Sequence, residues 1–190
     1  MSPSRLNMNL AETPLKGAFV IESEPFRDSR GLFVRLFCQD GLKEIIKNIS
    51  ISQINYSLTI EKGSIRGLHF QYPPKAEVKM VRCLSGSVFD VIVDIRHNSP
   101  TLLKWHSEII SADNMKMMYI PKGFAHGFQT LEPNCTLLYL HSEPYDPSCE
   151  GALRHNDPML GIKWPLTTTL VSDRDFNHPL LTSDFSGLVI

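Results

Sequence analysis

The sequence lacks a long hydrophobic run, an excess of charge of either sign and closely paired cysteines. Its longest apolar stretch, VFDVIVDI, is interrupted by aspartates, and the N-terminus has no continuous apolar core like that of a signal peptide. We therefore expect no membrane partner and a cytoplasmic location. With 19 basic and 20 acidic residues and no run of like charge, the chain is not expected to bind nucleic acid, which favours a small-molecule partner.

Internal repeats, low-complexity tracts and linkers are also missing. A length of 190 residues with 42% hydrophobic residues predicts a single globular domain over residues 1–190, with a flexible N-terminus over about residues 1–14. The four cysteines lie far apart without a CxxC pair, and a domain of this size does not need disulfides. We expect them to be reduced thiols.

Short apolar runs separated by 13 prolines and 11 glycines are typical of many short antiparallel strands. Strands are predicted at residues 18–23, 32–37, 49–57, 64–71, 78–84, 88–95, 103–110, 117–121 and 136–142. One early helix is predicted at residues 41–48, where the apolar residues form a single stripe. The pattern predicts an all-β fold, a sandwich or jelly-roll barrel with few short helices.

The runs at 78–84 and 88–95 flank a Ser-Gly-Ser turn and show period-two alternation, so they predict a β-hairpin. In that hairpin Lys79 and Asp90 project from the same face. Charged side chains facing the inside of a barrel indicate a polar lumen.

Two histidines lie among glycines and apolar residues, His69 in IRGLHFQ and His126 in PKGFAHGF. A metal-binding double-stranded barrel would need a second histidine two positions after the first and a carboxylate further on. Gln71 and Lys79 stand at those two places, and an ammonium repels a metal ion. We therefore predict no metal, which leaves both histidines available for proton transfer.

Alternation places His69 on one face with Gln71, and Tyr139 on one face with His141. If both strands line the lumen, His69, Tyr139 and Lys79 form a set suited to proton abstraction beside a carbonyl, without a cofactor.

Structural roles remain open at this stage. Lys79 could pair with Asp90 or Asp94, and Tyr139 could be a core phenol. Phe33 and Trp105 are interpreted as core residues. Surface positions are predicted for the remaining histidines that lie among turn or polar residues, His97, His106, His155 and His178.

Taken together, a series of segments resembles one known family from about residue 15 to residue 182. The segments are DSRGLFVRLF, SQINYS, IRGLHFQYPP, VKMVRCLSGSVFDVIVDIR, YIPKGFAHGFQTL, LLYLHSEPYDP, GIKWP and VSDRDFNHPLL. The chain is similar to the dTDP-4-dehydrorhamnose 3,5-epimerase family. The resemblance implies a cupin-type jelly roll that works without metal or cofactor, usually as a homodimer. The implied activity is epimerisation at C3, C5 or both in a nucleotide-linked 4-keto-6-deoxyhexose, of the type that converts dTDP-4-dehydro-6-deoxyglucose to dTDP-4-dehydrorhamnose for polysaccharide biosynthesis.

Residue by residue, the resemblance implies that His69 is the general base and Tyr139 the general acid on the opposite face. Asp175 would orient His69, and Lys79 would stabilise the oxyanion at C4. His126 would contact substrate. Further substrate contacts are implied for Arg66 at the diphosphate, for Arg30 and Phe33 from the neighbouring subunit, and for Gln53, Asn55 and Tyr145.

The chain departs from the family pattern at Arg35, where an acidic residue is usual, and at Leu140, where a lysine usually follows the tyrosine. These positions leave the native sugar and nucleotide open. The alternatives are a mono-epimerase of another nucleotide keto sugar and a sugar-nucleotide binding module without turnover. A metal-dependent cupin enzyme is a third, which Gln71 and Lys79 at the expected ligand positions disfavour.

Overall fold

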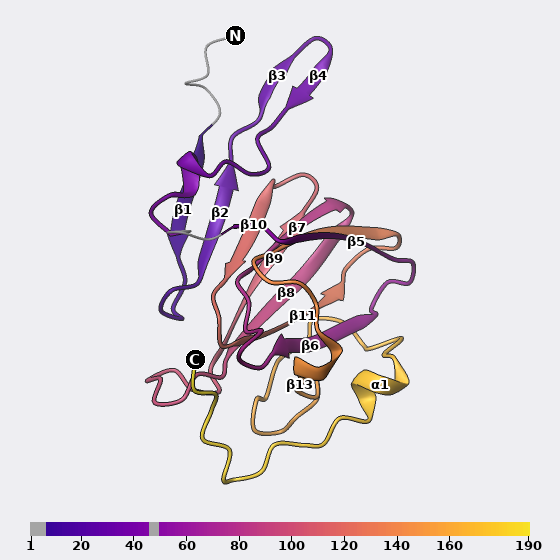
Figure 1. The fold of residues 1–190 in the computed structure, drawn as a ribbon. Helices are drawn as coiled ribbons and strands as arrows, with labels where there is room; N and C mark the ends of the chain where they lie inside the picture. Colours follow the sequence, from indigo (N-terminus) through magenta and orange to yellow (C-terminus); the bar gives the residue numbers. More distant parts are fainter. Residues whose placement is uncertain (1–6, 46–49) are drawn as a thin grey trace.

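The computed structural model describes residues 7–45 and 50–190 as two facing antiparallel sheets (Figure 1). The larger sheet has the strand order β1 (Met8–Glu12), β2 (Phe19–Ser23), β10 (Lys116–Ile120), β7 (Lys79–Ser85), β12 (Cys135–His141), β5 (Gln53–Thr59). The smaller has the order β13 (Glu150–Ala152), β6 (Ile65–Gln71), β11 (Phe124–Thr130), β8 (Ser87–Asp94), β9 (Trp105–Ser111). A hairpin of β3 (Phe26–Asp28) and β4 (Gly31–Phe33) projects away from both.

Helical structure in the described part of the chain is limited to single turns. They are η2 (Asp40–Leu42), η3 (Pro147–Cys149) and α1 (Asp173–Phe176). The predicted all-β jelly-roll class with few short helices is confirmed. The predicted helix at 41–48 is replaced by η2, and residues 46–48 lie outside the described residues.

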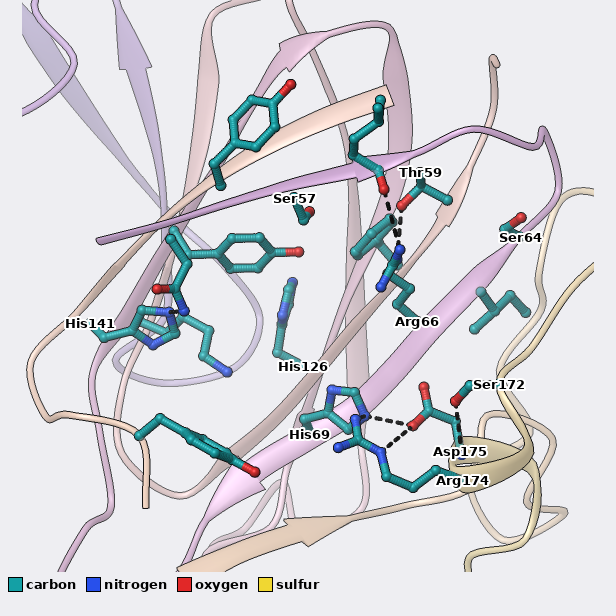
Figure 2. A pocket seen from close by; sticks show the side chains of 18 of the residues that line it. Ser57, Thr59, Ser64, Arg66, His69, His126, His141, Ser172, Arg174 and Asp175 are labelled. Carbon is teal, nitrogen blue, oxygen red and sulfur yellow. Dashed lines mark hydrogen bonds and ion pairs between the residues drawn. The ribbon is translucent and has the colours of Figure 1, made fainter. Parts of the chain in front are cut away.

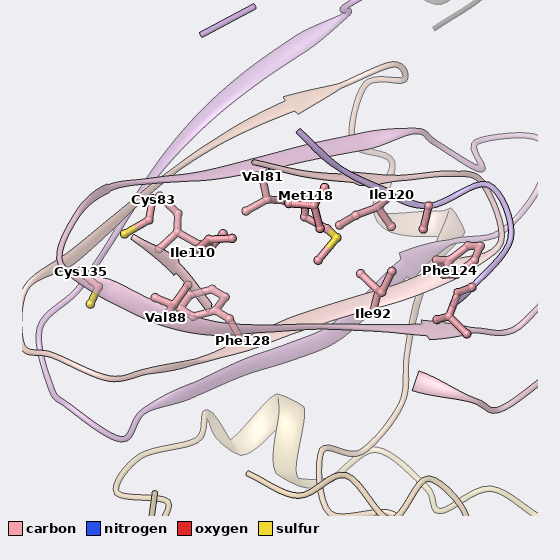
Figure 3. Packing of buried hydrophobic residues seen from close by; sticks show 14 residues of the cluster. Val81, Cys83, Val88, Ile92, Ile110, Met118, Ile120, Phe124, Phe128 and Cys135 are labelled. Atoms are coloured by element: carbon pink, nitrogen blue, oxygen red, sulfur yellow. The ribbon is translucent and has the colours of Figure 1, made fainter. Parts of the chain in front are cut away.

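The space between the two sheets is filled at one end by apolar side chains (Figure 3). Val81 and Cys83 of β7 meet Val88 and Ile92 of β8 there, all of them almost fully buried. Val91 and Val93, which alternate with these residues of β8, point to the opposite face and pack against residues of the C-terminal segment. Because β8 is buried on both faces, it carries apolar residues at both sets of alternating positions.

The predicted hairpin between residues 78–84 and 88–95 is wrong. β7 pairs with β10 and β12, whereas β8 pairs with β9 and β11, so the turn at Gly86 carries the chain from one sheet to the other. Period-two alternation identifies a strand and its faces, but it does not identify the neighbouring strand. Lys79 and Asp90 therefore belong to opposite sheets. Lys79 lines the cavity described below, and Asp90 is hydrogen-bonded to His126, another residue of that cavity.

Other differences from the sequence prediction concern edges and short strands. Residues 8–12, expected to belong to a flexible N-terminus, form β1 along the edge of the larger sheet. The strand expected at 32–37 ends at Phe33. β11 and β13 were not predicted, and β11 carries one of the histidines discussed below.

Within the described residues, no helix is long and apolar enough to cross a membrane. All four cysteines are free, as expected.

Candidate active site

A cavity of about 1190 Å³ opens between the sheets at the end that the apolar core leaves unfilled. Its walls come from β5, β7 and β12 of the larger sheet, from β6 and β11 of the smaller sheet, and from the segment around α1. Most of the predicted site residues line it: Gln53, Asn55, Arg66, His69, Lys79, His126, Tyr139, Tyr145 and Asp175. Figure 2 shows residues of these elements converging on one space.

His69 and Asp175 form a hydrogen-bonded pair at the cavity wall. His69 Nε2 lies 2.9 Å from Asp175 Oδ1 (Figure 2). The Gly67 N–H donates to Asp175 Oδ2 at 3.0 Å. Ser172 caps α1 by accepting a hydrogen bond from the Asp175 N–H, which fixes the carboxylate in place. A carboxylate at Nε2 holds the proton on that nitrogen and leaves Nδ1 as the basic one.

The side chain of Asp175 is only 4% exposed, whereas that of His69 is 28% exposed. Burial alone would favour the neutral acid. The hydrogen bond and charge of His69, the Gly67 N–H and the nearby Arg174 together outweigh that effect and hold the pKa of Asp175 well below its usual range. The pair is therefore an ionised carboxylate supporting an accessible imidazole.

The glycines of the RGLHF and AHGF segments allow β6 and β11 to approach closely. A Cβ on Gly67 would lie 2.6 Å from the His126 carbonyl oxygen, and one on Gly127 would lie 2.6 Å from the Arg66 carbonyl oxygen. Gly67 also has φ of 110°, which side-chain-bearing residues rarely adopt. This approach makes His69 and His126 direct partners across the two strands.

Tyr139 lies between two histidine rings. His126 meets it edge-on with centroids 6.3 Å apart, and His141 stacks on it at 6.0 Å with an interplanar angle of 17°. Burial raises the pKa of the Tyr139 phenol, so the hydroxyl keeps its proton at neutral pH. The alternation that predicted Tyr139 and His141 on one face is confirmed, with Leu138 and Leu140 packed on the other.

His126 is paired with a second carboxylate. Its Nε2 lies 2.7 Å from Asp90 Oδ1, and the two side chains are 5% and 0% exposed. This pair is more deeply buried than His69 and Asp175. Its imidazole lines the cavity edge-on to Tyr139 and is taken as the floor of the cavity.

Lys79 does not pair with Asp90 or Asp94. Its Nζ lies 3.3 Å from Glu77 Oε1, and the other carboxylate oxygen of Glu77 lies 2.7 Å from His141 Nδ1. Burial opposes ionisation of Glu77, but His141 and Lys79 together lower its pKa.

Arg66 is positioned by a donated hydrogen bond from Nε to Thr59 Oγ1 at 2.9 Å and from Nη2 to the Leu58 carbonyl at 3.2 Å. Arg30 and Phe33 are not brought to this cavity within one chain. Both lie on the projecting β3–β4 hairpin, where Arg30 pairs with Asp28. Phe33 is 58% exposed, so its interpretation as a core residue is wrong.

The polar residues of the cavity wall that sequence reasoning missed include Glu77, His141, Glu150 and Arg174. Arg174 Nη1 contacts Glu150 Oε1 at 3.1 Å, and Nη2 lies 3.3 Å from His69 Nε2. Strand alternation puts His141 on the same face as Tyr139, so the sequence could have predicted His141 as a cavity residue. The surface prediction for His155 is also wrong, since that residue is buried.

Groups of side chains with the composition of a metal site are not found in the described part of the chain, where no three His, Cys, Asp or Glu residues gather suitably. The three histidines of the cavity are each paired with one carboxylate. Such pairs are suited to holding and moving protons.

Comparison with known proteins identifies the family of this chain over most of its length. The family model of dTDP-4-dehydrorhamnose 3,5-epimerase matches residues 12–183. The dTDP-4-dehydrorhamnose 3,5-epimerase of Salmonella typhimurium is 40% identical over 176 residues, covering 92% of this chain and 96% of that protein. The Bacillus anthracis dTDP-4-dehydrorhamnose 3,5-epimerase, solved with TDP and PPi bound, has a TM-score of 0.88 at 41% identity, covering 92% of this chain and 99% of that one. The Legionella pneumophila dTDP-6-deoxy-D-glucose-3,5-epimerase in complex with dTDP-4-keto-L-rhamnose has a TM-score of 0.87 at 36% identity, covering 92% and 93%. The chain belongs to the dTDP-4-dehydrorhamnose 3,5-epimerase family, as its sequence motifs predict.

Proposed function

We propose that this protein epimerises C3 and C5 of dTDP-4-dehydro-6-deoxyglucose, giving dTDP-4-dehydrorhamnose for polysaccharide biosynthesis. The observation that carries the proposal is the carboxylate-paired imidazole of His69 in the same cavity as the half-buried phenol of Tyr139. Family membership and the keto sugar bound by the Legionella relative support the substrate class.

In the proposed mechanism, His69 Nδ1 removes the proton from a carbon next to the C4 ketone. The electron pair of the broken C–H bond moves into an enolate, whose oxygen lies beside the Lys79 ammonium. Tyr139 then donates a proton to the same carbon from the other face, which inverts it. After the inversion, His69 releases its extra proton to water and Tyr139 regains a proton from water, which restores both groups. Because C3 and C5 both flank the ketone, one base can then serve both centres in turn. A general acid or base contributes about 10² to 10⁴ in rate, and one oxyanion donor about 10² to 10³.

We assign the nucleotide and sugar contacts to the other cavity residues. Arg66 suits the diphosphate, because a guanidinium offers a forked and permanent charge. His126 and Tyr145 are proposed as further contacts. Gln53 and Asn55 are hydrogen-bonded to each other on β5 at 3.1 Å and are proposed to contact the nucleotide.

We further propose a homodimer in which the β3–β4 hairpin completes the site of the partner. Two features support this. Arg30 and Phe33 lie exposed on that hairpin, and the outward face of edge strand β5 exposes Ile54, Tyr56 and Leu58. Exposed apolar stripes of this kind are typical of interaction surfaces. A cytoplasmic location is also proposed, and the four free thiols support it.

Subunit complementation tests this arrangement. We expect His69→Ala protein and Arg30→Ala/Phe33→Ala protein each to be weakly active. In a mixed dimer one of the two sites combines an intact base with an intact hairpin, so an isolated mixed dimer should show about half of the wild-type activity and an equal mixture after random exchange about a quarter. A mixed dimer as inactive as its parents would refute hairpin exchange.

The main activity is tested by deuterium incorporation. Incubated in D2O with dTDP-4-dehydro-6-deoxyglucose, the wild-type protein should incorporate deuterium at C3 and C5, and His69→Ala should not. Incorporation at one carbon would reassign the protein as a mono-epimerase. Tight binding by calorimetry without incorporation would support a binding module and refute the enzymatic proposal.

A further inference from the structure

Three ionisable side chains form one connected cluster in the cavity wall, and the mechanism above uses only Lys79. The side chains of Glu77, Lys79 and His141 are 9%, 11% and 12% exposed. The two oxygens of Glu77 are divided between the partners, since Oε1 lies 3.3 Å from Lys79 Nζ and Oε2 lies 2.7 Å from His141 Nδ1. Glu77 is thus the central member of the cluster.

The strand pairing holds this cluster rigidly. Lys79 begins β7, and His141 ends β12 as its direct partner across the sheet. The second ring nitrogen of His141 lies 3.4 Å from Asn55 Nδ2, and the ring stacks on Tyr139. The same imidazole therefore contacts the carboxylate that holds Lys79 and the ring of the proposed general acid.

A catalytic ammonium needs such support. Lysine carries its charge on a flexible four-carbon chain, whereas an oxyanion donor contributes most when it is already in place before the reaction. A neighbouring carboxylate has a second and opposite effect, because it partly cancels the positive field that the enolate oxygen would feel. Neutralising the carboxylate should lower kcat if positioning of the ammonium dominates, and should raise kcat if cancellation of its positive field dominates. The two effects can therefore be distinguished.

We propose that Glu77 is a positioning residue for the reaction, holding the Lys79 ammonium at the C4 carbonyl while His141 holds Glu77. The inference rests on the proposed function. It also gives His141 a task that neither the proton transfer nor the nucleotide contacts require.

The test is a double-mutant cycle read by steady-state kinetics and deuterium incorporation. Glu77→Gln keeps the shape but has only one acceptor oxygen for two partners, so kcat should fall about tenfold with KM within about twofold. Lys79→Met should lower kcat about 10² to 10³. The double variant should match Lys79→Met alone, because Glu77 acts through Lys79. His141→Phe, which keeps a ring against Tyr139 but removes Nδ1, should resemble Glu77→Gln.

The matched control is Glu143→Gln. Glu143 pairs with Lys75 at the same 3.3 Å, but it lies outside the cavity, so both kinetic constants should stay unchanged. Glu77→Asp, which keeps the charge on a shorter side chain, should also lower kcat and provides a second test should Glu77→Gln fold poorly.

A kcat for Glu77→Gln equal to or above the wild-type value would overturn the positioning role, and so would additive losses in the double variant. No incorporation by the wild-type protein would instead refute the proposed function, and this inference with it.

Discussion

The most direct test of the His69–Asp175 pair is the substitution Asp175→Asn. The carboxylate has two fixed tasks, accepting from the Gly67 N–H at 3.0 Å and from His69 Nε2 at 2.9 Å. An asparagine of the same shape has one acceptor. Its carbonyl oxygen is needed at the backbone N–H, so its amide would point its own N–H groups at His69 Nε2. That nitrogen must then give up its proton, which moves to Nδ1.

The expected effect is large because the imidazole is left in the wrong tautomer for accepting a proton at Nδ1. A change of this kind in a catalytic triad costs about 10⁴ in kcat. We expect a loss of about 10³ to 10⁴ here, or about 4 to 5.5 kcal/mol of transition-state stabilisation at about 1.4 kcal/mol per factor of ten. KM should change little, since the carboxylate is covered by α1 and β6 and is almost inaccessible to substrate.

The assay is the rate of deuterium incorporation at C3 and C5, followed by NMR under saturating substrate. Asp173→Asn is the matched control, since it lies two residues earlier on the same helix turn and is exposed. It should react within about twofold of the wild-type rate. If folded Asp175→Asn protein kept more than a tenth of the wild-type rate, the tautomer argument would be wrong.

Three further predictions concern the acid, the strand contact and the pH dependence. Tyr139→Phe should still incorporate deuterium through His69, but its rate of epimerisation should fall about 10²-fold. An equal fall in the rates of deuterium incorporation and epimerisation would contradict the assignment. Gly67→Ala should destabilise the fold by about 2 to 4 kcal/mol in chemical denaturation, against about 1 kcal/mol for Gly31→Ala, which shares a positive φ but has open space around it. Since the pKa of Asp175 is lowered on folding, its stabilisation is present at neutral pH and is lost as acid protonates it. The melting temperature of Asp175→Asn should therefore fall less than that of the wild type between pH 5 and pH 3, and parallel curves would refute this.

Periodicity predicted the faces of the strands well. On β12 the order Leu138, Tyr139, Leu140, His141 alternates between the outer core and the cavity, as the sequence alone predicts. This success has a simple physical cause, because the side-chain period of a strand is two in any sheet. The placement of Lys79 and Asp90 on one face is different, because it depended on a hairpin that the structure does not contain.

Periodicity could not predict which strands are neighbours. β7 and β8 are adjacent in the chain and joined by a turn, yet they belong to opposite sheets. The choice depends on long-range contacts that no local pattern contains. For the same reason Glu77 was missed, because its importance arises from His141, which lies 64 positions later in the chain.

The three imidazole–carboxylate pairs explain why residue type alone does not identify the base. His69, His126 and His141 each lie within 2.9 Å of a carboxylate oxygen and line the same cavity. They differ in access, since the side chain of His69 is 28% exposed whereas those of His126 and His141 are 5% and 12% exposed. A base must reach the carbon from which it takes a proton, and it must keep one ring nitrogen free of other partners. His141 contacts polar groups through both nitrogens, and His126 lies at the floor against fully buried Asp90. His69 combines an accessible ring with an ionised partner held by α1, and this combination is the reason why we propose His69 as the base.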